Sequence, residues 1–250
     1  MPLTDDVINR LRNMIQSGEL PPGSRLPPEH QLAAQMGVSR GGVREAVKVL
    51  ESARVLDVRR GDGTYVTSLE PHLLLEGIGF AFELLQGRTL LEVMEVRRLL
   101  EPVATALAAS RVTPAQINEL TVVAERMQLA RDDAEELLPL DISFHRLVVV
   151  AAGNETLTSL LDGLSGRTAR ARVWRGIVEG NVSQATIDEH RAILSAMRAG
   201  DQQLAHAAAL MHVNTSESWL RAMLAQPAST TRQPDPRVTE PRQPPIPATP

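Results

Sequence analysis

The chain has 250 residues, of which 43% are hydrophobic and 22% charged, and its net charge is −4. This composition excludes a fibrous protein, and the length allows two globular domains. The absence of cysteine excludes disulfides, thiolate metal ligands and a cysteine nucleophile. The sequence has neither a signal-peptide pattern at its start nor an apolar run near the ~18 residues of a membrane span, so we expect a cytoplasmic protein without membrane contacts.

The charge is unevenly distributed along the chain. Residues 1–68 carry nine basic and eight acidic side chains, whereas residues 69–226 carry fourteen basic and twenty acidic ones. Because the basic residues of the first segment gather toward its end, a local basic face is compatible with the negative net charge. Nucleic-acid binding by the first segment is therefore not excluded.

The first 68 residues predict three short helices followed by a hairpin. Apolar residues at helical spacing indicate a helix that Thr4 caps and that runs through about Ser17, and "GELPPGSRLPP" ends it. The remaining predicted elements are helices over 29–35 and 39–52 and strands over 55–58 and 64–67. Gly37 fits the turn between the second and third helices, which requires a positive φ. This order is that of a winged helix-turn-helix.

The third helix opens unusually, because Gly41 and Gly42 lie in its first turn. Each glycine inside a helix costs roughly 1 kcal/mol relative to alanine. Ser39 suits the N-cap, or it can hold a phosphate at the positive helix end. The missing side chains would let the backbone approach a DNA groove closely, since recognition helices meet base edges with their N-terminal residues.

Basic residues of this module fit the contacts that DNA requires. Arg40 and Arg44 are one turn apart, and an arginine in the major groove can bind guanine O6 and N7. Lys48, Arg59 and Arg60 suit phosphate or minor-groove contacts. The alternative is a solvated basic face on a winged helix that binds another protein.

The stretch "SGELPPGSRLPPEHQLAAQMGVSRGGVREAVKVL" followed by "RRGDGTYV" resembles the DNA-binding domain of the GntR superfamily of bacterial transcription regulators. The resemblance implies a homodimer on a short palindromic operator, with Arg40 and Arg44 on bases and the wing tip, Arg60 and Gly61, in the minor groove. The sequence departs from the family at His30, where an arginine is frequent, and at the two glycines, where polar residues are frequent.

Residues 69–226 predict an all-α domain of about seven helices. Leu, Ala, Val, Arg and Glu recur at helical spacing, with interruptions near 87, 113, 132, 153, 180 and 200. Residues 227–250 hold eight of the 17 prolines and few core formers, so we expect this tail to be disordered. The fold class is therefore mainly α, with an N-terminal winged helix-turn-helix and a C-terminal helical bundle.

A set of possible metal ligands lies on the helices of the second domain. Asp141 and His145 are four residues apart and share one helical face, and His190 and His212 have apolar neighbours at helical spacing. A carboxylate and three imidazoles suit a divalent metal, with zinc expected first and nickel, manganese or iron as alternatives. Taken singly, each histidine also fits a hydrogen-bonded core position.

Apolar neighbours at helical spacing also turn Arg97 inward, whereas Arg98 has Glu95 and Glu101 as candidate exposed partners. A buried arginine needs an acceptor, which is either the carboxylate of a small ligand or a buried acidic residue. Asn154 either helps to form a pocket or caps the helix that follows it. Six aromatic residues among Phe, Tyr and Trp leave little surface for a flat cofactor, so a small polar acid is the favoured ligand.

The segments "EVRRLLEPVATALAA", "DISFH", "AAGN", "EHRAIL" and "HVNTS" resemble the FCD domain of the FadR-like branch of the superfamily. The resemblance implies a divalent metal on Asp141, His145, His190 and His212 and an effector-binding arginine at Arg97. Together these features predict a transcription regulator, acting as a repressor, whose operator affinity a small organic acid controls. The alternatives are a metal-dependent hydrolase with a DNA-binding tether and a DNA-binding protein without an effector.

Overall fold

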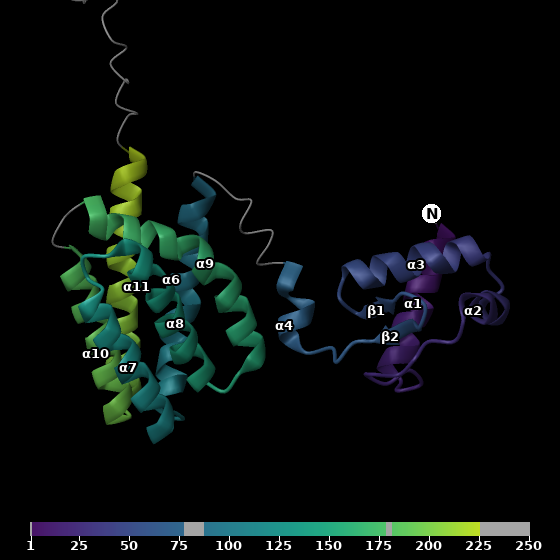
Figure 1. Ribbon diagram of the computed structural model, residues 1–250, viewed down its shortest axis with the longest axis horizontal. Helices are drawn as coiled ribbons and strands as arrows, with labels where there is room; N and C mark the ends of the chain where they lie inside the picture. Colours follow the sequence, from purple (N-terminus) through teal and green to yellow (C-terminus); the bar gives the residue numbers. More distant parts are fainter. Residues whose placement is uncertain (1, 78–87, 179–181, 226–250) are drawn as a thin grey trace, which may run out of the picture.

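A computed structural model describes residues 2–77, 88–178 and 182–225. The proline-rich tail and the predicted breaks at Gly87 and Gly180 lie outside these ranges. Figure 1 shows two bodies, a small one from the N-terminal part and a helical bundle from the C-terminal part. This architecture confirms the predicted fold class.

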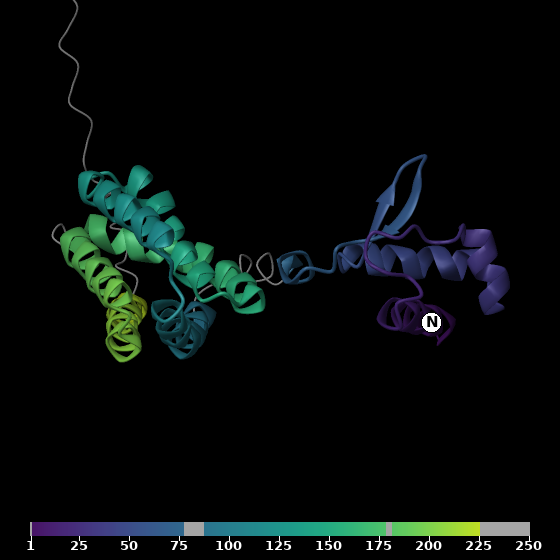
Figure 2. The ribbon, with the colours of Figure 1, turned by 90° about the horizontal axis from the view of Figure 1, so that it is seen from below.

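The small body contains α1 (Pro2–Gln16), α2 (Glu29–Met36) and α3 (Arg40–Ser52), followed by the hairpin of β1 (Leu56–Arg59) and β2 (Gly63–Val66). The strands are antiparallel, with Leu56 opposite Val66, and the hairpin stands out from the three helices (Figure 2). One helix boundary differs from the prediction. The first helix begins at Pro2, so Thr4 lies inside its first turn instead of capping it.

A compact apolar core holds the winged helix-turn-helix together. Val7 and Leu11, one turn apart on α1, and Val43 on α3 are fully buried. The turn between α2 and α3 forms as predicted, because Gly37 takes the left-handed conformation at φ 66° and ψ 32°. Since non-glycine residues rarely adopt this conformation, Gly37 fixes the angle at which α3 leaves α2.

The described part of the bundle consists of long helices, and the single-turn helix α4 (Pro71–Leu74) precedes them. Its helices are α6 (Arg88–Ala109), α7 (Pro114–Leu129), α8 (Ala134–Ala151), α9 (Glu155–Val178), α10 (Val182–Ala199) and α11 (Gln202–Ala225). Thr113 caps α7 in a reciprocal capping box with Gln116, which confirms the predicted break there. Gly153 and Gly200 take positive φ values between helices, as their predicted positions require.

The functional side chains of the bundle sit inside it. Most of the interior is apolar, with Phe144 and Leu120 fully buried. Ten polar or charged side chains are nevertheless buried among the described residues, and they include Arg97, Glu101, Asp141 and three histidines. Buried charges are costly unless they are paired, so this group needs a physical explanation.

Candidate nucleic-acid interface and candidate metal centre

The N-terminus of α3 has a side-chain cap, and its first turn contains two glycines. Ser39 Oγ accepts a hydrogen bond of 3.1 Å from the backbone N–H of Gly42, which confirms the predicted N-cap. A Cβ atom on Gly41 would meet Ser39 Oγ at 3.9 Å, and one on Gly42 would meet it at 3.5 Å. Both are ordinary contact distances. Nothing within the described fold therefore requires glycine at these two positions.

The side chain of Arg44 is exposed and already carries a carboxylate partner. Its Nε and Nη2 donate to Glu29 Oε1 and Oε2 at 3.3 and 2.9 Å. The hydrogen bond and the charge of Glu29, at the start of α2, raise the pKa of the guanidinium. A paired guanidinium fork of this kind has the geometry that a guanine edge or a phosphate also accepts.

Other predicted DNA contacts lie on the same small body. Lys48 Nζ is 2.9 Å from Glu45 Oε1, and both side chains are exposed. In the wing, Arg59 pairs with Asp57 at 2.9 Å and stacks on Tyr65, 4.3 Å from the ring centroid. The hydrogen bond to Asp57 raises the pKa of Arg59.

The wing turn and the helix surface hold the rest of the predicted interface. Gly61 has a φ of 78°, which a glycine adopts without strain. The residues of this body that remain exposed include Arg40 on α3 and Arg60 beside Gly61. The structure thus places the predicted residues on α3 and the wing, the two elements with which winged helices contact DNA.

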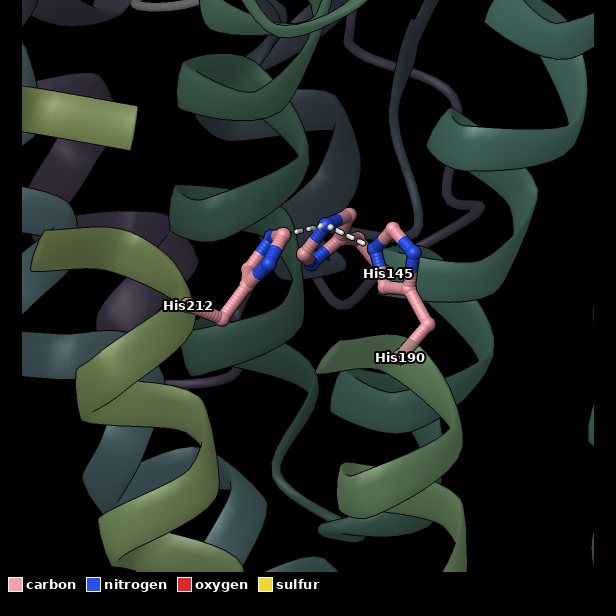
Figure 3. A group of neighbouring side chains, drawn as sticks. All are labelled: His145, His190 and His212. Atoms are coloured by element: carbon pink, nitrogen blue, oxygen red, sulfur yellow. Dashed lines mark hydrogen bonds between the residues drawn. The ribbon is translucent and has the colours of Figure 1, made fainter. Parts of the chain in front are cut away.

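The three histidines of the bundle converge from three helices (Figure 3). His145 Nε2, from α8, lies 3.2 Å from His190 Nε2 of α10 and 3.2 Å from His212 Nε2 of α11. Asp141 Oδ1 lies 3.6 Å from His190 Nε2 and 3.9 Å from His145 Nε2. The four residues predicted as metal ligands are therefore neighbours, and all are buried.

These spacings fit a shared metal ion. Nitrogen ligands bind zinc at about 2.0–2.1 Å, so two of them on one ion are roughly 3.0 Å apart at a right angle and roughly 3.4 Å apart in a tetrahedron. The two Nε2 distances of 3.2 Å fall between these values. The carboxylate oxygen lies slightly farther away, at a distance that wider bond angles accommodate.

Two carboxylates contact the Nδ1 atoms of His145 and His212. Glu101 Oε1 on α6 lies 2.5 Å from His145 Nδ1, and Glu189 Oε2 on α10 lies 2.9 Å from His212 Nδ1. A carboxylate accepts a hydrogen bond, so we assign the proton of each neutral ring to Nδ1. The Nε2 atoms then carry lone pairs, and those of His145 and His212 face each other at 3.2 Å.

Facing lone pairs repel unless a proton or a cation lies between them. A set of three convergent Nε2 atoms beside a carboxylate is thus arranged for a Lewis acid. Sequence reasoning predicted the four clustered residues but missed Glu101 and Glu189 beside them. The available signals were the spacing of Glu101, four residues after Arg97, and the position of Glu189 directly before His190.

Arg97 is fully buried, as predicted, and its acceptor is an acidic residue. Its Nε and Nη2 lie 2.9 and 2.7 Å from Glu101 Oε2, and its Nη1 donates to Thr168 Oγ1 at 2.9 Å. This is the structural ion pair that the sequence left open. Glu101 therefore pairs with Arg97, and the expectation that it accompanies Arg98 is wrong. Arg98 lies near Glu95, as predicted, and near Glu217.

Asn154 lies apart from the histidines. Its Oδ1 accepts a hydrogen bond of 3.0 Å from the backbone N–H of Leu157, so it caps α9. It also lines a cleft of about 560 Å³ between α4 and helices α8 and α9, together with Arg146 and Asp162. Burial raises the pKa of Asp162, although Arg146 acts in the opposite direction.

Comparison with known proteins gives matches along most of the chain. Residues 3–66 match the family model described as "Bacterial regulatory proteins, gntR family", and residues 92–215 match the FCD domain. No helix among the described residues has the length and hydropathy that crossing a membrane requires.

The matched relatives align over most of this chain and nearly all of their own length. The HTH-type transcriptional regulator LutR of Bacillus subtilis is 31% identical over 212 residues, which cover 83% of this chain and 96% of LutR. The galactonate operon transcriptional repressor of Escherichia coli is 30% identical, with 87% and 96% covered. The solved structure of Streptococcus agalactiae GntR matches with a TM-score of 0.64 at 30% identity, over 86% of this chain and 99% of that one.

Proposed function

We propose a specific function from one premise: the chain belongs to the GntR family of bacterial regulatory proteins and is a DNA-binding transcription regulator with an FCD domain. In this proposal it is a cytoplasmic repressor that binds a palindromic operator as a homodimer. A small carboxylate effector, bound at or near a divalent metal in the bundle, controls its affinity for the operator. The observation that carries the proposal is the convergence of three histidine Nε2 atoms and Asp141 inside the effector domain.

The DNA-reading part is supported by the exposed face of α3. Arg40 and Arg44 would enter the major groove from the glycine-opened end of α3, with Arg44 exchanging Glu29 for a guanine edge. This exchange costs little, since water compensates for the loss of an exposed ion pair. Lys48 and the wing residues Arg59, Arg60 and Gly61 would contact the backbone and the minor groove.

The metal part rests on ligand type and charge. Asp141, Glu101 and Glu189 bring three carboxylates to the histidine cluster, and Arg97 brings one positive charge. A divalent cation among these groups would offset the negative charges of the carboxylates. The ligand set suits zinc first, and nickel, manganese and iron are alternatives.

The effector part depends on the coordination number of the metal. Four protein ligands can close a tetrahedral site, but an octahedral ion has two further positions, which water or a small carboxylate can take. The name of the Escherichia coli relative supports both a repressor role and the acid class, because galactonate is a small hydroxy acid. Arg97 and Asn154 remain predicted effector contacts, and the present partners of both would have to change or be shared.

The dimer is supported by the outer face of α6. Val96, Leu99 and Val103 are 38%, 60% and 48% exposed and lie at positions i, i+3 and i+7, so they form one apolar stripe. A regulator with one reading helix per chain needs a second copy to bind a palindrome. We propose that this stripe packs against its copy in the partner subunit.

A direct test combines metal analysis with selection of duplex DNA by the full-length protein. We expect one bound zinc ion per chain and enrichment of one palindromic sequence over random competitor. The double variant His190→Ala/His212→Ala should lose the metal and the response to a panel of small hydroxy acids, while its operator affinity stays within about threefold. His206→Ala, on the same α11 but outside the cluster, is the matched control and should behave like the wild type.

Two results would contradict this function. Full metal content in the double variant would exclude these histidines as ligands, and operator affinity indifferent to every acid would favour a DNA-binding protein without an effector. Turnover of simple esters or amides by the zinc-loaded protein would favour the hydrolase alternative, which needs a metal-activated water and a general base.

A further inference from the structure

A continuous line of buried polar contacts runs from the histidine cluster to α9. His145 contacts Glu101 through Nδ1, the second oxygen of Glu101 contacts Arg97, and Arg97 Nη1 donates to Thr168. The exposed fractions of these four residues are 3%, 4%, 0% and 0%. Three helices besides α10 and α11 are thus joined at the metal centre through side-chain contacts.

The centre of this line is the buried ion pair between Arg97 and Glu101. Arg97 Nε donates a hydrogen bond of 2.9 Å to Oε2 of Glu101, and Nη2 lies 2.7 Å from the same oxygen, so the other oxygen of Glu101 is left for His145. Removing one partner of a buried ion pair leaves an uncompensated charge, which is far more costly than removing an exposed one. The carboxylate of Glu101 is therefore held in one orientation between the guanidinium and the imidazole.

We propose that Glu101 and Arg97 are positioning residues of the metal centre. Glu101 holds the proton of His145 on Nδ1, so that Nε2 faces the metal as an electron-pair donor, and its charge makes the ring a stronger ligand. Arg97 holds Glu101 in place and is itself anchored by Thr168. This inference rests on the metal site of the proposed function, and it gives Arg97 a role in addition to the predicted contact with the effector.

Glu189 does the same for His212 from a less buried position. Its side chain is 22% exposed, whereas that of Glu101 is 5% exposed. Water weakens the effect of a charge on its neighbour, so the more buried carboxylate should matter more for metal affinity. The structure thus predicts an order of effects, Glu101 before Glu189.

The experiment measures the affinity of the full-length protein for Zn²⁺ by competition with a chromogenic chelator. Glu101→Gln keeps the shape of the side chain and removes its charge, and we expect about 10-fold to 100-fold weaker binding. Glu189→Gln should show a smaller loss. Glu95→Gln, on the same α6 but with an exposed side chain, is the matched control and should stay within twofold of the wild type.

A second variant keeps the test decisive if Glu101→Gln does not fold. The double change Arg97→Gln/Glu101→Gln removes both charges together and avoids an unpaired buried guanidinium. It should fold and bind Zn²⁺ about as weakly as the single variant. At saturating Co²⁺ both variants should keep the wild-type visible absorption bands, because the ligands are unchanged, whereas His145→Ala should alter them.

Three outcomes would overturn the inference. The first is a Zn²⁺ affinity within twofold of the wild type for the Glu101 variants, and the second is an equal loss in Glu95→Gln. The third is a Co²⁺ spectrum of Glu101→Gln that matches His145→Ala, since that would make Glu101 a ligand. If the wild type itself bound no Zn²⁺, the metal centre of the proposed function would be wrong as well, and this result is distinct from the other three.

Discussion

The arginines of the two domains have opposite environments. In the winged helix, the side chain of Arg44 is 61% exposed and faces one carboxylate, whereas in the bundle Arg97 is completely buried between a carboxylate and a hydroxyl. The first arrangement can be opened at little cost, because water replaces the lost contact. The second costs about 3–5 kcal/mol to break from one side. An arginine thus forms an exchangeable surface pair in one domain and a fixed buried pair in the other.

Helix α6 has buried charged residues on one side and exposed apolar residues on the other. Its inner side carries the buried charges of Arg97 and Glu101, and its outer side carries the exposed apolar stripe of Val96, Leu99 and Val103. The inner side also holds apolar residues such as Val93, Met94 and Ala104, so the buried charges and the exposed apolar stripe are both exceptions to the usual amphipathic pattern. The inner charges are explained by the histidine cluster, and the outer stripe is explained if a second subunit covers it.

The largest effect is expected from breaking the stripe on α6. Leu99→Arg places a charge in the proposed dimer interface, so the protein should become monomeric in sedimentation. Operator affinity should then fall by about 10²-fold or more, because the two half-sites are no longer bound together. Metal content should not change, since Leu99 lies on the outer side of the helix.

The control for this change is Leu204→Arg on α11. Leu204 is 53% exposed, similar to Leu99, but it lies on another helix. It should leave both the dimer and the operator affinity unchanged. A dimer that survives Leu99→Arg, or one that Leu204→Arg also disrupts, would show that the interface lies elsewhere.

A smaller effect is expected from Arg44→Ala, which tests the exchangeable arginine. On a duplex with one half-site, specific binding should weaken by about 1–3 kcal/mol, because a bidentate contact to guanine is lost. Binding to random DNA should weaken less. Lys48→Ala is the comparison: it should weaken specific and random binding alike and reduce the slope of log affinity against log salt by about one.

Equal losses on specific and random DNA for Arg44→Ala would rule out base reading by this residue. The role of Glu29 would then be reduced to a surface ion pair. A preference for one base pair that disappears in Arg44→Ala would instead locate the contact in the operator.

Much of the fold could be predicted because its signals are local. Ser39, Gly37 and Thr113 mark helix ends through hydrogen bonds and φ values that depend on a few neighbouring residues. The predicted ligands could be found for a related reason. Asp141 and His145 share a helical face by their spacing alone, and the apolar neighbours of His190 and His212 indicate that both point inward.

The supports of the ligands could not be predicted, because they depend on which helices pack side by side. Glu101 can pair with Arg97 at spacing i+4 or with Arg98 at spacing i+3, and both spacings are favourable on a helix. Only the packing of α6 against α8 decides between them, by placing Glu101 beside His145. The start of the first helix was missed for a simpler reason, since Pro2 is also a favourable first residue of a helix.

The smallest effects are expected from Gly41→Ala, which should raise the stability of the protein and lower its affinity for the operator. The added methyl group has free space, with Ser39 Oγ at 3.9 Å, and alanine is the better helix former. The free energy of unfolding should therefore rise by up to about 1 kcal/mol, measured by denaturant titration. Operator affinity should fall several-fold if the backbone of this turn approaches the groove closely.

Gly37→Ala is the control for glycine replacement itself. Because residue 37 has a positive φ, this variant should be less stable than the wild type. A stabilised Gly41→Ala protein that binds the operator as well as the wild type would show that DNA does not use the space beside this turn.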